Sequence, residues 1–288
     1  MIAKETILQR VQALPALSTA VAELASLRDD PLATALAYER VIRPDPALST
    51  NFLRLANSAH FGTRHEIKTV RAALALLGTK RLYEVVVGAA LHGVLPERLP
   101  GYEVDLPGFW RHCAAVAALS ERLSTELRVG APDFVFTAGL LHDIGKLVIG
   151  SFLAAESAEV LARVRGSEKT FIDAEHEVLG WDHSEIGAEV ARAWRLPEAV
   201  VDTARWHHSP SECPTANRTL VDMVHVADGL AHSLGMGADT GELARRIEVP
   251  AMQRLHVTAR TLERIACDSL ANIKDLCHSL EGNAGRTS

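Results

Sequence analysis

The sequence lacks the features that mark secreted, disulfide-bonded and membrane-spanning proteins. Its four cysteines form no CxxC pair, which argues against a disulfide framework and against a zinc–thiolate site. The first residues lack the basic start and apolar run of a signal peptide. The apolar runs Val85–Leu91 and Phe134–Leu141 are far shorter than the roughly 20 residues of a membrane-spanning helix. We therefore expect a cytoplasmic protein with no membrane partner.

A strong charge of one sign is also missing. The formal net charge of -6 at pH 7 gives no field that would hold a polyanion, so no nucleic-acid partner is expected. Phosphate-binding glycine motifs are absent as well: Leu77-Gly-Thr-Lys80 lacks the upstream glycine of a P-loop, and Gly235-Met-Gly237 lacks the third glycine of a dinucleotide fingerprint. No GxSxG serine-hydrolase elbow is present either.

Helical periodicity is what the chain has in abundance. Apolar residues recur three and four positions apart, as in Leu48, Phe52 and Leu55, and no stretch alternates cleanly enough to predict a strand. The sequence therefore predicts an all-α protein. Capping residues predict helix starts, and glycines after long periodic runs predict helix ends. The predicted starts are Asp30, Asp45, Thr69 and Thr258, and the predicted ends are Gly78 and Gly130.

The clearest seam is Leu95–Tyr102, where two prolines and a glycine interrupt the helical pattern. We predict a helical bundle over residues 1–98, a second helical domain over 99–238, a helical extension over 239–281 and a disordered tail over 282–288. The amphipathic stretch Thr258–Leu280 is expected to pack within the chain rather than on another chain.

The sharpest local feature is the pair His142-Asp143, which we place inside a helix running from about Pro132 to Gly150. Neighbouring helical side chains leave the axis about 100° apart, so an imidazole and a carboxylate could bind one cation from a single turn. Gly139 and Gly145 flank the pair. Glycine is costly inside a helix, so its presence here predicts close backbone approach.

Further ligands are available elsewhere in the same half of the chain. His112 lies on the preceding helix, His207-His208 closes a later one, and Asp228 lies in the next. His183 follows the capping pair Asp182 and Glu185, so we expect the helix dipole to lower its pKa and keep its ring neutral. Any one of these histidines alone could be an ordinary core residue. The remaining histidines are expected to have no ligand role: His60, His65, His92, His176, His225, His232, His256 and His278.

The series His112, His142-Asp143 and Asp228 resembles the H…HD…D signature of HD-superfamily phosphohydrolases, whose four residues hold a divalent metal. His183, His207 and His208 resemble the additional ligands of the HD-GYP branch, which holds two or three metals and hydrolyses cyclic dinucleotides. Motifs in both halves are similar to those of the HDOD domain, over roughly residues 7–235. They are Leu14-Pro-Ala-Leu17, Ile42–Leu48, Leu53–Gly62, Ala73–Gly78, Phe109–His112, Ala138–Lys146 and Trp194–Pro197.

The resemblance implies an all-α fold in which the second domain is HD-like. HDOD members look like bacterial signalling modules, found alone or attached to response-regulator receivers, and act on protein partners. Ser209–Pro214 replaces the loop that follows the histidine pair in HD-GYP proteins, which puts cyclic dinucleotide hydrolysis in doubt. We therefore favour a regulatory module with a signalling-protein partner and a bound metal.

The alternative is a metal-dependent phosphohydrolase acting on a phosphorylated small molecule or nucleotide. The metal would be Fe, Mn, Mg, Ni or Zn, since imidazole and carboxylate ligands suit several ions. Lys146 would then neutralise a substrate phosphate or fix Asp143, although a solvent-exposed lysine on the helix face is an equal expectation.

Overall fold

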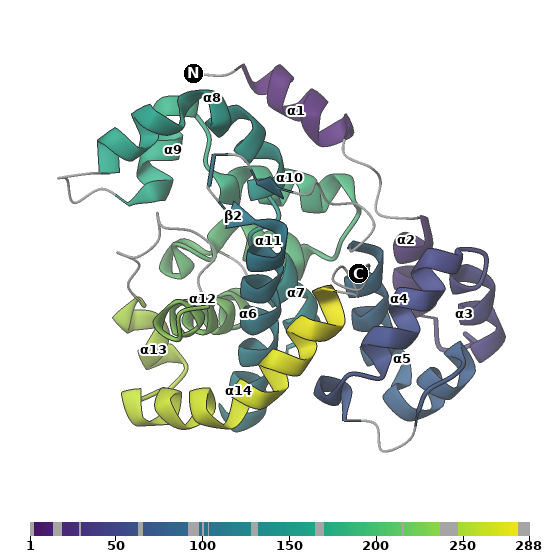
Figure 1. Ribbon diagram of the computed structural model, residues 1–288. Coiled ribbons are helices and arrows are strands. Elements are labelled where there is room, and N and C mark those ends of the chain that lie inside the picture. Colours follow the sequence, from purple (N-terminus) through teal and green to yellow (C-terminus); the bar gives the residue numbers. More distant parts are fainter. Residues whose placement is uncertain are drawn as a thin grey trace, which may run out of the picture. The chain divides into compact units, whose positions relative to one another are not determined.

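The computed structural model is almost entirely helical, which confirms the predicted all-α class (Figure 1). One short antiparallel ladder departs from the prediction: β1 Arg98–Leu99 pairs with β2 Val104–Asp105 inside or just after the predicted seam. The structure describes residues 3–13, 19–28, 30–62, 66–91, 98–99, 101–102, 104–127, 132–164, 170–214, 216–236 and 247–281. Several features of the sequence analysis lie outside these residues: the Leu14-Pro-Ala-Leu17 motif, His65, His92, Gly130, half of the seam (95–97 and 100) and the tail 282–288.

The chain forms two compact units. The site unit comprises Met1–Leu14 and Pro96–Ser269, and the second unit comprises Pro15–Leu95 and Leu270–Ser288. The predicted domain boundaries stay a prediction, because compactness does not test which segments fold independently.

The second unit holds α2 Thr19–Arg28, α3 Ala35–Ile42, α4 Pro46–Ala56, the 3₁₀ turn η1 Ala59–Phe61 and α5 Val70–Leu91. Asp45 caps α4 by accepting a hydrogen bond from the Leu48 backbone N–H (2.9 Å), as predicted. Gly78 interrupts α5 with a φ of 74°, which fits its predicted role as a helix end. The predicted helix start at Asp30 is wrong, because its carboxylate instead accepts from Leu32 N (2.8 Å) and closes a turn.

The site unit is built around α6 Leu106–Leu127, which packs against α7 Val135–Leu141 and α12 Arg218–Ser233. Two further helix pairs complete the part that positions the site: α8 with α9, and α10 with α11. Their bounds are α8 Lys146–Val164, α9 Phe171–Leu179, α10 His183–Ala193 and α11 Glu198–Trp206. The remaining elements of this unit are α1 Lys4–Ala13, the 3₁₀ turn η2 Pro210–Glu212, α13 Val249–Arg254 and the part of α14 Ala259–Glu281 that ends at Ser269.

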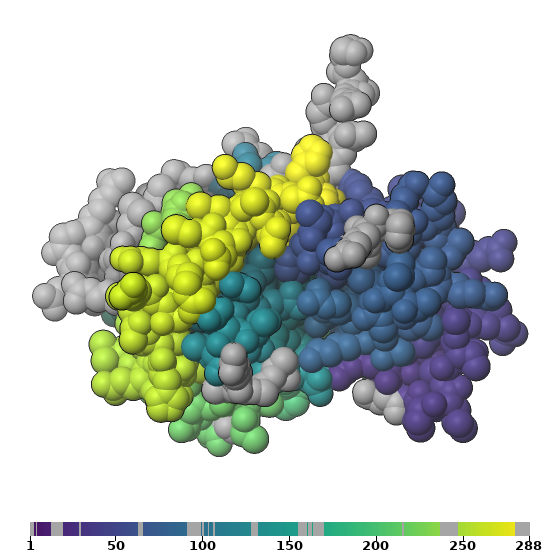
Figure 2. Space-filling model, turned by 90° about the horizontal axis from the view of Figure 1, so that it is seen from below, coloured from purple at the N-terminus to yellow at the C-terminus, as the bar shows by residue number. Residues whose placement is uncertain are grey.

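The first half of α14 lies on the surface of the site unit (Figure 2). Leu262, Ile265 and Ala266 are buried, and Asp268 accepts a hydrogen bond from Arg122 of α6 (3.0 Å). This half of the amphipathic stretch therefore packs within the chain.

Among the described residues, Val135–Ala154 is long and apolar enough to cross a membrane. This stretch is longer than the separate apolar runs identified in the sequence. However, 89% of its most apolar window is buried inside the protein. Such burial is typical of a core segment.

Candidate metal centre

The HD pair lies between two helices rather than inside one. The expected continuous helix is wrong: α7 ends at Leu141, residues 142–145 form a turn, and α8 begins at Lys146. Short-range backbone bonds hold this turn, among them Lys146 N to Asp143 O (2.9 Å). The two side chains still meet, since His142 Nε2 lies 3.4 Å from Asp143 Oδ2.

The glycines that flank the pair allow close backbone approach, as predicted. A Cβ added at Gly139 would lie 2.8 Å from the Ala117 Cα of α6. A Cβ added at Gly145 would overlap the His183 carbonyl oxygen at the start of α10. Only glycine therefore lets the turn reach both neighbouring helices.

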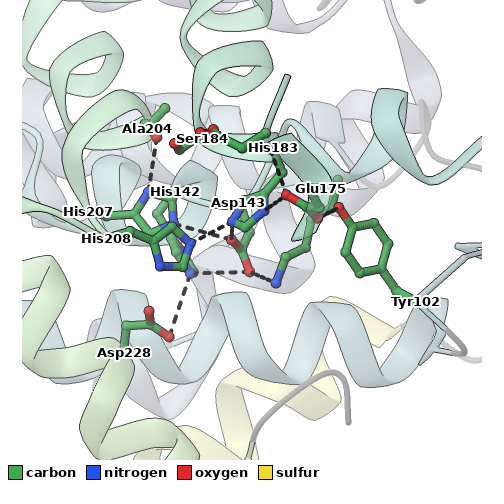
Figure 3. Close-up of polar contacts among 12 residues, drawn as sticks. Tyr102, His142, Asp143, Glu175, His183, Ser184, Ala204, His207, His208 and Asp228 are labelled. Atoms are coloured by element: carbon green, nitrogen blue, oxygen red, sulfur yellow. Dashed lines mark hydrogen bonds and ion pairs between the residues drawn. The ribbon is translucent and has the colours of Figure 1, made fainter. Parts of the chain in front are cut away.

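The structure brings all eight predicted site residues to one place within the site unit (Figure 3). They come from α6, the α7–α8 turn, the first residues of α8 and α10, the end of α11 and the middle of α12. Metal binding by these residues and a catalytic role for Lys146 stay predictions. The residues are His112, His142, Asp143, Lys146, His183, His207, His208 and Asp228.

Asp143 lies at the centre of the cluster and faces four imidazoles. Its Oδ2 is 3.6 Å from His112 Nε2 and 3.4 Å from His142 Nε2. Its Oδ1 is 3.4 Å from the Nε2 atoms of both His183 and His207. Two donor groups therefore share this carboxylate.

The first donor group consists of His112, His142, Asp228 and Asp143 Oδ2. His112 Nε2 lies 3.3 Å from His142 Nε2 and 3.1 Å from Asp228 Oδ1, and the His142 to Asp228 distance is 3.8 Å. Four donors bound at about 2.1 Å to one tetrahedral ion lie about 3.4 Å from one another. The spacing of this group therefore fits a single first-row cation.

The second donor group consists of His183, His207, His208 and Asp143 Oδ1, which lie within 4.8 Å of one another. His183 Nε2 and His208 Nε2 are 2.6 Å apart. Two nitrogen lone pairs approach this closely only when a proton or a cation lies between them. This group too could hold a cation.

The far side of each of the four rings that face Asp143 is fixed by a hydrogen bond. Nδ1 contacts an acceptor-only oxygen in all four rings that face Asp143, so Nδ1 carries a proton, and it is Nε2 that would present a lone pair to a cation at the centre once its own proton has left. The acceptors are Met236 O for His112 (3.0 Å), Gly139 O for His142 (2.8 Å), Ala204 O for His207 (2.9 Å) and Glu175 Oε2 for His183 (2.7 Å). This arrangement is typical of metal-ligating histidines.

Glu175, on α9, is a site residue that the sequence reasoning missed. Its side chain is fully buried, and its two oxygens contact Tyr102 and His183 (Figure 3). A signal existed: Phe171, Ala174 and Leu179 form the buried face of α9, and Glu175 is the acidic residue on that face.

His232, for which no ligand role is expected, borders the first donor group. It lies one turn after Asp228 on α12, with its Nε2 3.4 Å from Asp228 Oδ1, and its ring centre is 4.8 Å from that of His112. The i,i+4 spacing from a predicted ligand could have identified it. His225, by contrast, has the structural role expected of it: it contacts the His207 carbonyl oxygen through Nδ1 and the Glu248 N–H through Nε2.

Burial and charge shift the pKa values of the central groups in the metal-free protein. Burial of Asp143 opposes its ionisation, but the charges of His142 and Lys146 more than compensate, so the pKa of Asp143 lies well below its ordinary value. Burial also opposes the charged form of His142 and so lowers its pKa. The adjacent Asp143 carboxylate raises that pKa by more, so the net shift is upward.

The predicted lowering of the His183 pKa is wrong. Burial acts in that direction, but the Glu175 carboxylate against Nδ1 outweighs it and raises the pKa of His183 to about 9. His183 does open α10 behind the predicted capping box. The helix dipole is simply a smaller influence than a buried carboxylate in contact.

Lys146 is buried, and its Nζ lies 2.8 Å from Asp143 Oδ2. The solvent-exposed alternative is therefore wrong. In this position the ammonium group neutralises the shared carboxylate and fixes its orientation.

The centre is shielded from solvent. His112, His142, Asp143, His207 and Asp228 are 0% exposed and His183 is 1% exposed. Two described histidines near the centre are partly exposed: His208, in the second donor group, and His232, which lies beside Asp228 of the first. Shielding of this kind strengthens the attraction of the carboxylates for a cation.

Two solved structures resemble this fold over nearly the whole chain. A putative phosphohydrolase from Shewanella amazonensis SB2B is 28% identical, with a TM-score of 0.75, over 95% of this chain and 97% of that one. An HDOD domain protein of unknown function from Geobacter sulfurreducens is 23% identical, with a TM-score of 0.74, over 97% and 99% of the two chains. The second likeness concerns the fold alone.

Two curated relatives are longer than this chain. An uncharacterized protein of Treponema pallidum is 26% identical over 90% of this chain and 50% of its own length. Ribonuclease Y of Clostridium kluyveri is 27% identical over 54% of this chain and 24% of its own length. The chain thus spans half or less of the curated relatives it matches.

The family model of the HDOD domain matches residues 14–210, which is well over half of the chain. This match includes the motifs of both halves and seven of the eight predicted site residues, whereas Asp228 lies beyond it. The chain therefore belongs to the HDOD domain family.

Proposed function

We propose that the site unit binds two divalent cations that share Asp143 and that it hydrolyses a phosphate ester. The observation that carries this proposal is the position of Asp143, whose Oδ2 faces the first donor group and whose Oδ1 faces the second. A carboxylate that bridges two imidazole-rich sites is suited to a pair of cations. The likeness to a putative phosphohydrolase from Shewanella amazonensis supports the reaction class.

The residues of the chain have separate tasks in this proposal. His112, His142 and Asp228 would hold one cation, and His183, His207 and His208 would hold the other. The cations would neutralise phosphate charge and lower the pKa of a bound water. Lys146 keeps Asp143 ionised and oriented. The partly exposed His208 and His232 mark the side from which a phosphate group would approach.

A second function, a regulatory module without turnover, is favoured by the burial of the ligands. Six of them are 0–1% exposed, which leaves little ligand surface open to a substrate. Ser209–Pro214 follows the histidine pair and includes the 3₁₀ turn η2, in which Pro210 is buried. In this case the cations would stabilise the fold, and the module would act on a signalling-protein partner in the bacterial cytoplasm.

Metal analysis combined with a hydrolysis assay tests both functions. Protein purified without chelators or nickel resin is analysed by mass spectrometry and assayed with bis(p-nitrophenyl) phosphate and p-nitrophenyl phosphate. If the protein is a phosphohydrolase, the wild type should contain about two metal equivalents and hydrolyse a test ester, and Asp143→Asn should abolish this hydrolysis. His278→Gln is the matched control, because this exposed histidine belongs to none of the candidate cation groups among the described residues.

The outcomes separate the alternatives. Two metal equivalents without hydrolysis of any phosphate ester tested would favour the regulatory module. Wild-type protein that stays metal-free after reconstitution, while remaining folded, would reject both metal-dependent functions.

A further inference from the structure

We propose that Glu175 is a positioning residue for the second cation, and that it makes the two cation sites unequal in affinity. This inference rests on the proposed two-cation centre. It concerns a residue that binds no cation itself but acts through His183.

Glu175 holds His183 at two points. Its Oε2 accepts from the His183 backbone N–H (3.0 Å) and from His183 Nδ1 (2.7 Å). The first contact fixes the start of α10, and the second fixes the plane of the ring. His183 Nε2 is thereby aimed at Asp143 Oδ1 (3.4 Å).

Glu175 is itself held from the other side. The Tyr102 hydroxyl donates to Oε1, so both carboxylate oxygens are engaged. Tyr102 is 3% exposed, and its ring lies under the Lys146 ammonium, 5.5 Å from Nζ to the ring centre. The chain Tyr102–Glu175–His183 therefore runs from a buried tyrosine to the second donor group (Figure 3).

The acceptor behind His183 differs in kind from those behind the other three rings that face Asp143. His112, His142 and His207 donate from Nδ1 to neutral backbone carbonyls, whereas His183 donates to a carboxylate. An anionic acceptor makes the ring a stronger electron donor toward a cation on Nε2. The second site should therefore lose affinity when this charge is removed, while the first site should keep its own.

A packing role alone does not account for Glu175. A buried carboxylate carries a large desolvation cost, which an apolar residue on the same face of α9 would avoid. Glu177, two positions later, lies away from that face, pairs with Arg163 (3.2 Å) and has a side chain that is 37% exposed. Glu177 is thus a matched control on the same helix.

The test is a titration of the full chain with Mn²⁺. Binding is monitored by calorimetry and by the electron paramagnetic resonance of Mn²⁺. Wild type and Glu177→Gln should bind two equivalents. Glu175→Gln, which is nearly isosteric, should weaken one equivalent by about 10–100-fold and leave the other unchanged. Tyr102→Phe should weaken the same equivalent by a smaller factor.

Two results would overturn the proposal, and they are distinguishable. If wild type binds two equivalents and folded Glu175→Gln binds both with wild-type affinity, the positioning role is wrong while the two-cation centre stands. If wild type binds fewer than two, the proposed centre itself fails. Should Glu175→Gln not fold, Tyr102→Phe decides, because unchanged affinity at both sites in that variant contradicts the role.

Discussion

At the scale of single residues, Gly145 is the position where the centre tolerates least change. An added methyl group would overlap the His183 carbonyl oxygen and press on Gly187 N. We expect Gly145→Ala to lower the free energy of unfolding by about 2–3 kcal/mol and to weaken cation binding, because α10 must move away with His183. Urea denaturation and metal titration measure the two effects.

Gly187→Ala is the control for this prediction. Its added Cβ would meet Ala204 Cβ and Gly145 N at 3.4 Å, an ordinary contact, and alanine favours a helix over glycine by about 1 kcal/mol. Equal destabilisation by the two substitutions would argue against the special role of Gly145.

The pKa of His183 predicts a pH dependence for the metal-free protein. Because the folded-state pKa of about 9 exceeds the ordinary value of 6.5, the stabilisation is fully present below about pH 6.5 and is lost as the pH rises through 9. The loss should be roughly 3 kcal/mol. Denaturation in the presence of EDTA at several pH values measures it, and Glu175→Gln should show a much flatter profile. A wild-type profile as flat as that of the variant would be inconsistent with the His183–Glu175 pair.

The residues that could be predicted are those whose chemistry is evident from residue type and spacing. His112, His142-Asp143, His183, His207-His208 and Asp228 stand out because imidazoles and carboxylates recur where a helical bundle can gather them. Glu175 does not stand out, since the sequence around it also holds Asp173 and Glu177, which look the same until burial separates them. The direction of the His183 pKa shift could not be predicted for the same reason, because it depends on the buried Glu175 carboxylate.

At the scale of elements, the capping box of α10 sets the position of His183. Asp182 Oδ1 accepts from Glu185 N (2.8 Å) and from Ser184 Oγ (2.6 Å). We expect Asp182→Ala to cost about 1 kcal/mol and to weaken the second cation site. Thermal denaturation and Mn²⁺ titration test this. Asp45→Ala removes the equivalent cap from α4 in the second unit, so it should cost a similar amount without changing cation affinity.

Helix starts were predictable where a capping side chain bonds within its own turn. Asp45, Thr69 and Thr258 each accept from the backbone N–H three residues later. Asp30 failed because its carboxylate bonds two residues ahead and closes a turn instead. The break at residues 142–145 was not visible in the periodicity, because buried apolar residues on both sides continue the pattern while α10 fixes the turn through Gly145.

At the scale of the whole molecule, cation binding should couple to unfolding. The eight site residues come from six segments of the site unit, so unfolding would disperse the ligands. A cation at 100 times its dissociation constant should stabilise the protein by about 2.7 kcal/mol and raise the apparent Tm by roughly 5–10 °C. Differential scanning fluorimetry with Mn²⁺ and then EDTA measures this. His142→Ala combined with Asp143→Asn should not respond, and a response equal to that of wild type would place the binding elsewhere.

The shielding of the ligands has a consequence for time as well as for affinity. With six ligands 0–1% exposed, an ion can enter or leave only on the side of the partly exposed His208 and His232, or where neighbouring helices separate locally. Exchange would then be slower than diffusion, so the occupant would partly reflect the ions present when the protein folded. The metal content of such a centre would change slowly when the concentrations of the available metal ions change.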